Sequence, residues 1–250
     1  MLFQAHRGVS TEYPENTMPA FVAAYEQGYQ IIELDPAFTA DGHCVTFHDK
    51  TVSRTCRRDD GAVPEDTAVA DMTLSRLQAL DAGLFLGEQF RGTKVPLLCD
   101  VLAFAAEKKL LVKLDNKFER FSPENREIFF QIVEKSGAKV AYTCKYPETI
   151  ALVAERFPDV QIHYDGPVTR QNLEQVKSVL RSNPLSVWLP LPSHLTDWVK
   201  VPMASPELCA MVKEYGQLGL WILETREQLQ QAKALGADII ETTGSIKPEE

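Results

Sequence analysis

Seven side chains that could do chemistry lie at the ends of short apolar runs, far apart along the chain. They are His6, Arg7, Glu33, Asp35, His48, Lys113 and Asp115. If the apolar runs are strands of a parallel barrel, the C-terminal ends of these strands meet at one face, and the seven side chains converge there. Alternation along a strand also places Glu33 and Asp35 on one side of their strand, and Lys113 and Asp115 on one side of theirs.

This set of residues favours phosphoryl chemistry. Carboxylates as close as Glu33, Asp35 and Asp115 would repel one another without a cation between them. Oxygen ligands without a thiolate select a hard ion such as Mg²⁺ or Ca²⁺. A divalent ion, together with Arg7 and Lys113, would neutralise a phosphodiester and its transition state.

Two histidines could provide acid–base catalysis at such a site. The ordinary pKa of histidine lies near neutrality, so His6 and His48 could exchange protons with the attacking group and with the departing alcohol. For His6 the simpler alternative is a structural histidine at a strand end. For Asp115 the alternative is an ion pair with Lys113 or Lys117.

Strands and helices alternate along most of the chain. The first strand is expected just before His6, and further strands at 30–35, 44–47, 110–114, 139–143, 160–164, 186–189, 219–223 and 238–241. Apolar residues at helical spacing predict helices at 16–26, 125–135, 147–156, 169–181, 206–215 and 226–235. About eight such units in one chain predict a TIM-type (β/α)₈ barrel that occupies residues 1–250 as a single domain.

Two stretches interrupt this alternation. The segment between Asp35 and Val45 is too short for a helical crossover and contains the turn signal Asp41-Gly42, which indicates a hairpin-like excursion. Residues from about 50 to 94 are charged and have little strand signal. Loops longer than about 15 residues rarely lack structure, so we expect a small cap-like insertion over the barrel mouth after the third strand.

The composition excludes several classes of protein. A net charge of −9 argues against a general nucleic-acid binder. No apolar run approaches the roughly 20 residues that span a bilayer, and the N-terminus lacks a signal-peptide pattern, which predicts a cytoplasmic location. The five scattered cysteines lack CxxC spacing, so we expect reduced and mostly buried thiols.

Several short motifs resemble the N-terminal signature of glycerophosphodiester phosphodiesterases in order and spacing. They are His6-Arg7-Gly8, Pro14-Glu15-Asn16-Thr17, Ala20-Phe21, Glu33-Leu34-Asp35, Asp41-Gly42 and Phe47-His48-Asp49. Weaker similarity continues to 235–240. The resemblance implies a barrel enzyme that cleaves small glycerophosphodiesters to glycerol 3-phosphate and an alcohol. It also implies acid–base roles for His6 and His48, a metal at Glu33 and Asp35, and a phosphate contact from Arg7.

The sequence departs from that family at the expected fourth strand. Family members usually carry Glu-x-Lys there, whereas this chain has Lys113-Leu114-Asp115. We expect Asp115 to replace the missing carboxylate and Lys113 to supply the cation. A second departure, Leu223-Glu224 in place of the frequent Val-Asn, bears on the substrate.

Other functions stay open from the sequence alone. An apolar groove that continues to Trp198 would favour a related enzyme of lysophospholipase D type. The loop that contains Trp198 and His194 could instead form a contact between copies in a homo-oligomer. The rearranged fourth strand leaves open a catalytically weakened phosphodiester-binding or regulatory protein. The presence of both histidines argues against that reading.

Overall fold

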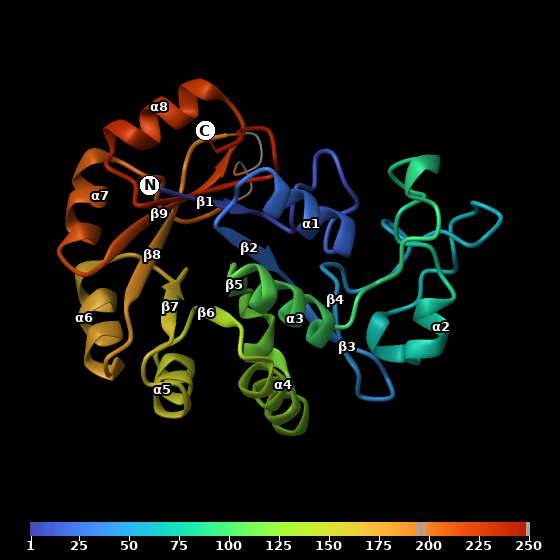
Figure 1. Cartoon of the computed structure of the whole chain (residues 1–250). Coiled ribbons are helices and arrows are strands. Elements are labelled where there is room, and N and C mark those ends of the chain that lie inside the picture. Colours follow the sequence, from blue (N-terminus) through green and yellow to red (C-terminus); the bar gives the residue numbers. More distant parts are fainter. Residues whose placement is uncertain (194–195, 197–198, 249–250) are drawn as a thin grey trace.

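Eight parallel strands form a closed barrel in the computed structural model, which describes residues 1–193, 196 and 199–248 (Figure 1). The strands are β1 (Leu2–Ala5), β2 (Ile31–Leu34), β5 (Leu111–Leu114), β6 (Lys139–Cys144), β7 (Gln161–Tyr164), β8 (Leu185–Pro190), β9 (Gln217–Leu223) and β10 (Ile239–Thr242). The barrel closes because β1 pairs in parallel with both β10 and β2. The predicted TIM-type barrel is confirmed.

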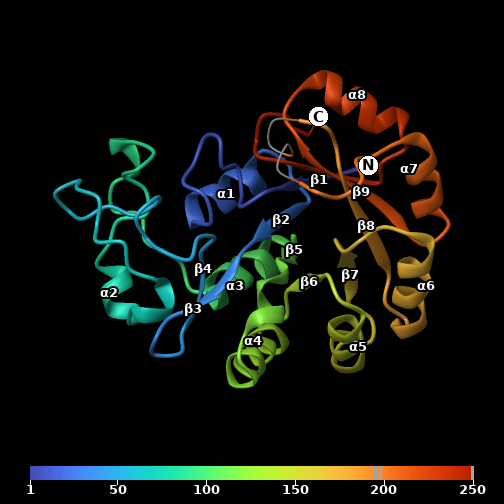
Figure 2. The ribbon, with the colours of Figure 1, turned by 180° about the vertical axis from the view of Figure 1, so that it is seen from behind.

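Helices surround the barrel on the outside (Figure 2). They are α1 (Met18–Glu26), α3 (Leu98–Lys108), α4 (Pro123–Ser136), α5 (Pro147–Arg156), α6 (Arg170–Val179), α7 (Pro206–Lys213) and α8 (Arg226–Ala234). The sequence-based expectations lack α3, although its buried residues Leu98, Val101, Leu102 and Ala105 have helical spacing. In the part of the chain described, no helix has both the length and the apolar character needed to span a membrane.

The segment predicted as the third barrel strand lies in a separate hairpin. β3 (Pro36–Phe38) and β4 (Cys44–Thr46) pair antiparallel as a sheet of their own. Residues 39–43 between them cannot form a parallel crossover, which needs about a dozen residues. β5 is therefore the next barrel neighbour of β2, with Glu33 opposite Lys113. The prediction of a hairpin-like excursion is correct, and the inclusion of 44–47 in the barrel is wrong.

Residues 50–94 follow this hairpin and lie on one side of the barrel (Figures 1 and 2). They contain α2 (Leu74–Gln78) and two short 3₁₀ helices at Val69–Asp71 and Glu88–Phe90. A hydrophobic cluster joins this segment to the end of the hairpin; it includes Val45, Phe47, Val52, Val69 and Leu77. The segment packs against the end of the hairpin and extends outward from it, and its role as a cap over the barrel mouth stays a prediction.

An aromatic cluster packs against the 3₁₀ helix that follows β5. Its rings belong to Phe118, Phe129, Phe130, Tyr142 and Phe157, with centroids of neighbouring rings 5.2 to 6.1 Å apart. Phe118 is fully buried and belongs to the 3₁₀ helix Asn116–Arg120, which begins directly after Asp115. The cluster therefore holds in place the turn that carries the polar residues at the end of β5.

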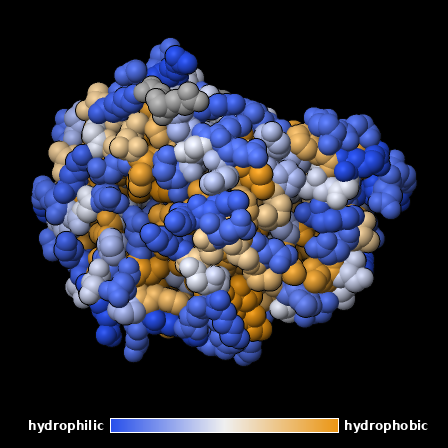
Figure 3. Space-filling view, in the orientation of Figure 1, coloured by the Kyte–Doolittle hydropathy of each residue, from blue (hydrophilic) through white to orange (hydrophobic). Residues whose placement is uncertain are grey.

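The face of the molecule in Figure 3 carries mostly hydrophilic residues, with apolar patches among them. All five cysteines are free, and Cys99 is exposed while the other four are buried, as expected from the sequence. Burial raises the pKa of the Cys44 and Cys144 thiols, so these side chains are uncharged members of the core.

Candidate active site

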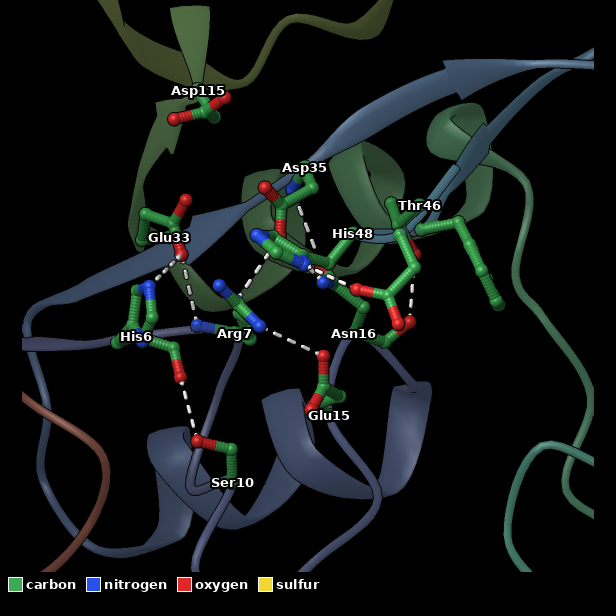
Figure 4. A network of polar contacts seen from close by, with 12 residues as sticks. His6, Arg7, Ser10, Glu15, Asn16, Glu33, Asp35, Thr46, His48 and Asp115 are labelled. Atoms are coloured by element: carbon green, nitrogen blue, oxygen red, sulfur yellow. Dashed lines mark hydrogen bonds and ion pairs between the residues drawn. The ribbon is translucent and has the colours of Figure 1, made fainter. Parts of the chain in front are cut away.

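Three carboxylates meet at the C-terminal end of the barrel. Glu33 lies in β2, and Asp35 and Asp115 directly follow β2 and β5. One oxygen of each lies within 4.8 Å of those of the other two (Figure 4). Glu33 and Asp35 are each only 3% exposed. The three residues expected from the sequence to share a site are thus brought together by neighbouring strands.

The charges of this acidic cluster are only partly neutralised by the protein. Burial, together with the nearby Asp35 and Glu241, raises the pKa of Glu33 well above its usual value. Burial and Asp35 also raise the pKa of Asp115. Burial opposes ionisation of Asp35 as well, but Lys117 and Arg7 outweigh it and lower the pKa of Asp35 to about 2. Three oxygen donors that resist joint ionisation fit a hard divalent cation.

The backbone at Arg7 and Gly8 follows an unusual path that points the chain toward the acidic cluster. Arg7 has φ 59° and Gly8 has φ 79°. A Cβ atom at Gly8 would lie 2.6 Å from Cβ of Ala20, so only glycine fits against α1. In this conformation the backbone N–H of Arg7 donates to Oε2 of Glu33 at 2.9 Å.

The Arg7 side chain bridges the acidic cluster and the loop before α1. Its Nη1 donates to Oε1 of Glu15 at 3.0 Å, and its Nε lies 3.4 Å from Oδ2 of Asp35. Asn16 completes the link, because its Nδ2 donates to Oδ2 of Asp35 at 2.7 Å and its Oδ1 accepts from the Asp35 N–H at 3.1 Å. The motif residues that precede α1 therefore orient Asp35.

His6 follows β1 directly and lies beside Glu33. Its Nε2 is 4.0 Å from Oε2 of Glu33. Burial is the main reason that the pKa of His6 falls to about 4, and Arg7 and Lys113 act in the same direction. His6 is therefore an uncharged imidazole at neutral pH.

His48 reaches the site from the loop after the β3–β4 hairpin. Its Nδ1 lies 2.6 Å from Oδ1 of Asp49, which is also paired with Arg54. Arg54 in turn donates to both carboxylate oxygens of Glu15 at 2.8 Å. The inserted segment thus contributes Arg54, which ties His48 and its partner Asp49 to the Arg7 network.

Lys113 is held inside the barrel by a residue that the sequence-based prediction missed. Its Nζ lies 3.1 Å from Oε2 of Glu241 in β10 and 4.0 Å from the centre of the Trp188 ring. The second donor to Glu241 is the amide of Gln4. The sequence did contain a signal for Glu241, because this carboxylate stands near the end of an apolar strand, as Glu33 does.

Lys117 supplies a second cation that the prediction treated only as an alternative partner for Asp115. Its backbone N–H donates to Oδ1 of Asp115 at 3.1 Å. Its ammonium forms an ion pair with Asp35 and not with Asp115, at 3.1 Å from Oδ1 of Asp35. The same ammonium donates to the carbonyl oxygens of Phe47 and His48.

These groups face a cavity of about 520 Å³. Its walls include six of the seven predicted residues, His6, Arg7, Glu33, His48, Lys113 and Asp115. Asp35 lies behind them in the acidic cluster. Further lining residues that the prediction missed include Thr143, Asp165, Trp188, Trp221 and Glu241. His194 and Trp198, considered above as a possible pocket wall, lie outside the described residues.

Solved structures share this architecture. A phosphodiesterase of Oleispira antarctica, solved in complex with the product sn-glycerol-3-phosphate, aligns with a TM-score of 0.81 at 18% identity, over 98% of this chain and 94% of that chain. A glycerophosphodiester phosphodiesterase of Agrobacterium tumefaciens aligns with a TM-score of 0.70 at 20% identity, over 97% of this chain and 96% of that chain. At these identities the likeness establishes the fold.

Comparison of the sequence with known proteins and with a family model shows the family of this chain. A glycerophosphodiester phosphodiesterase of Caldanaerobacter subterraneus is 42% identical over 113 residues, which are 45% of this chain and 44% of that protein. Another from Bacillus altitudinis is 28% identical over 63% of each chain, so both matches span less than two thirds of the relative's length. Residues 6–218 match the family model as well. The chain therefore belongs to the glycerophosphoryl diester phosphodiesterase family.

Proposed function

We propose that this protein hydrolyses glycerophosphodiesters to glycerol 3-phosphate and an alcohol. The observation that carries the proposal is the acidic cluster of Glu33, Asp35 and Asp115, which adjoins the cavity that His6 and His48 line. Family membership supports it, as do the names of the relatives. The product bound to the similar Oleispira antarctica phosphodiesterase supports a small glycerol phosphate substrate.

Glu33, Asp35 and Asp115 would hold a divalent ion, Mg²⁺ or Ca²⁺, through carboxylate oxygens. Such an ion supplies charge stabilisation for a phosphoryl group. Arg7 and Lys113 line the same cavity and would bind the phosphate oxygens by charge-assisted hydrogen bonds. Glu15 and Glu241 fix these two cations in the wall, so that little entropy is lost when substrate binds.

His6 and His48 would move the protons of the reaction. In hydrolysis the oxygen of water forms a bond to phosphorus, the bond from phosphorus to the alcohol oxygen breaks, and the alcohol oxygen gains a proton. His6, uncharged at neutral pH, would accept the proton of the attacking group. Asp49 can only accept a hydrogen bond from Nδ1 of His48, which leaves Nε2 as the atom that exchanges a proton with the departing alcohol.

Turnover of glycerophosphocholine and similar diesters tests the proposal. Activity should disappear with a chelator and return with Mg²⁺ or Ca²⁺. His6→Ala and His48→Ala should each lower kcat by about 10²- to 10⁴-fold, the usual contribution of an acid–base group. His43→Ala is the matched control, because its side chain is half exposed in the β3–β4 hairpin. Full activity after complete removal of metal, or near-normal kcat in either variant, would contradict the proposed mechanism.

A further inference from the structure

The cavity has a second polar wall opposite the acidic cluster. The acidic cluster and His6 belong to β1, β2 and β5 or directly follow them. Thr143 and Trp188 lie in the C-terminal halves of β6 and β8, and Asp165 directly follows β7. These three strands are neighbours in the barrel. The Asp165 N–H donates to the Cys144 carbonyl at 3.2 Å, and Trp188 follows Val187, which pairs with Tyr164. Asp165 and Trp188 are therefore at the same level on neighbouring strands, whereas Thr143 pairs with His163, two residues earlier, and all three residues line the cavity.

Each of these residues has a buried polar atom without a hydrogen-bond partner among the described residues. The atoms are Oγ1 of Thr143, Oδ1 of Asp165 and Nε1 of Trp188. Thr143 is 2% exposed and Trp188 is 3% exposed. Native proteins leave few buried polar atoms unpaired, because such an atom has lost its water without gaining a partner. Since all three residues line the cavity, a bound ligand can supply the missing partners.

Asp165 is oriented for this purpose by Asn116. Its Oδ2 accepts a hydrogen bond from Nδ2 of Asn116 at 2.8 Å, which leaves Oδ1 as the unpaired oxygen. Burial is the main cause that raises the pKa of Asp165 to about 7. Near neutral pH this carboxyl group can therefore accept a hydrogen bond or, when protonated, donate one.

The wall suits hydroxyl groups better than a quaternary ammonium. It offers a donor from Trp188, an acceptor from Asp165, and a hydroxyl of Thr143 that can do both. A trimethylammonium group cannot form hydrogen bonds with any of them. The indole of Trp188 also has the Lys113 ammonium 4.0 Å from its centre, and this charge would repel a second cation.

We propose that Thr143, Asp165 and Trp188 bind the hydroxyl groups of an uncharged polyhydroxy alcohol, which is the leaving group of the phosphodiester. Glycerol and inositol are alcohols of this class. The inference rests on the proposed function, since it assigns the alcohol side of the same cavity. Phosphate bound near the acidic cluster would then direct the ester-linked alcohol toward β6, β7 and β8.

The test compares kcat/KM for glycerophosphoglycerol, glycerophosphoinositol and glycerophosphocholine. The parent protein should prefer the two polyol diesters by about tenfold or more, as sites that hydrogen-bond a substrate reject analogues that lack the group. Thr143→Val keeps the shape of the side chain and should lower kcat/KM for the polyol diesters by about fivefold, mainly through KM. Its effect on glycerophosphocholine should be smaller, so the preference shrinks.

Trp188→Phe and Asp165→Asn are independent variants that should shrink the same preference. Thr67→Val in the inserted segment is the matched control and should leave the preference unchanged, because Thr67 does not line the cavity. A parent that prefers glycerophosphocholine, or variants that slow all three diesters equally, would overturn the inference alone. If the metal-loaded parent cleaves none of these diesters and not bis(4-nitrophenyl) phosphate either, both the inference and the proposed function are overturned.

Discussion

The ammonium of Lys117 lies 3.1 Å from Oδ1 of Asp35, beside the oxygens through which the acidic cluster would hold a metal ion. The same ammonium donates to the carbonyl oxygens of Phe47 and His48, at the end of the hairpin. Lys117 therefore neutralises part of the acidic cluster from within the protein and also connects the turn after β5 to the loop of His48.

Replacing Lys117 should reveal how strongly it competes with a metal ion. Lys117→Met removes one positive charge from Asp35, so the affinity for Mg²⁺ or Ca²⁺ should rise by about tenfold, equivalent to ~1.4 kcal/mol. The metal-free variant should unfold at a lower temperature, because Asp35 loses one of its two cationic partners and keeps only Arg7. Titration calorimetry measures the metal affinity and thermal unfolding measures the stability. Lys135→Met, at an exposed position of α4, is the control. Weaker metal binding by Lys117→Met would show that Lys117 assists the site.

Asp115→Asn tests whether the end of β5 supplies the third carboxylate. One charged oxygen donor would be lost, so metal affinity should fall and raised metal concentrations should restore part of the activity. Lys113→Met should instead raise KM for the diester while metal affinity is kept or improved, since a nearby positive charge is removed. Metal titrations of both variants decide the assignment. If only Lys113→Met loses metal, the third ligand lies elsewhere.

The buried pair of Lys113 and Glu241 should be costly to break. Their side chains are 9% and 5% exposed, so removal of one partner leaves the other charge in the barrel without compensation. Glu241→Gln should lower the free energy of unfolding by about 3 kcal/mol, the usual scale for such a change. The double variant Lys113→Met with Glu241→Gln should recover part of this loss. Urea unfolding of the parent, of Glu241→Gln and of the double variant measures these differences in stability. Equal stability of Glu241→Gln and the parent would exclude an ionised pair.

The pKa of His6 predicts a specific dependence of stability on pH. Its folded-state pKa of about 4 lies below the ordinary value of 6.5, so between these values the unfolded chain binds more protons than the folded protein. His6 therefore costs the folded state stability as the pH falls from 6.5 to 4, by at most about 1.4 kcal/mol per pH unit. His6→Gln should flatten this decline in thermal unfolding with chelator present. Identical pH profiles would mean that His6 keeps its ordinary pKa in the fold.

The hairpin and α3 show where the reading of the sequence succeeded and where it failed. The apolar run at 44–47 does contain a strand, because alternation and β-branched residues act locally. Its partner is β3 and not a barrel strand, and the decisive factor is the short connection of residues 39–43. The helical spacing in α3 was present in the sequence, so its omission was an error of interpretation.

The sequence by itself was enough to predict the barrel and the three residues of its acidic cluster. Periodicity marks each strand, the ends of parallel strands meet at one face, and strand alternation aligns Glu33 with Asp35, so convergence follows from local rules. The partners of the charged groups required the tertiary structure. Lys113 joins Glu241 across 128 positions of sequence, and Thr143, Asp165 and Trp188 form one wall only because their strands are adjacent. Ion pairs and unpaired polar atoms depend on distances between segments, and these are fixed only when the barrel closes.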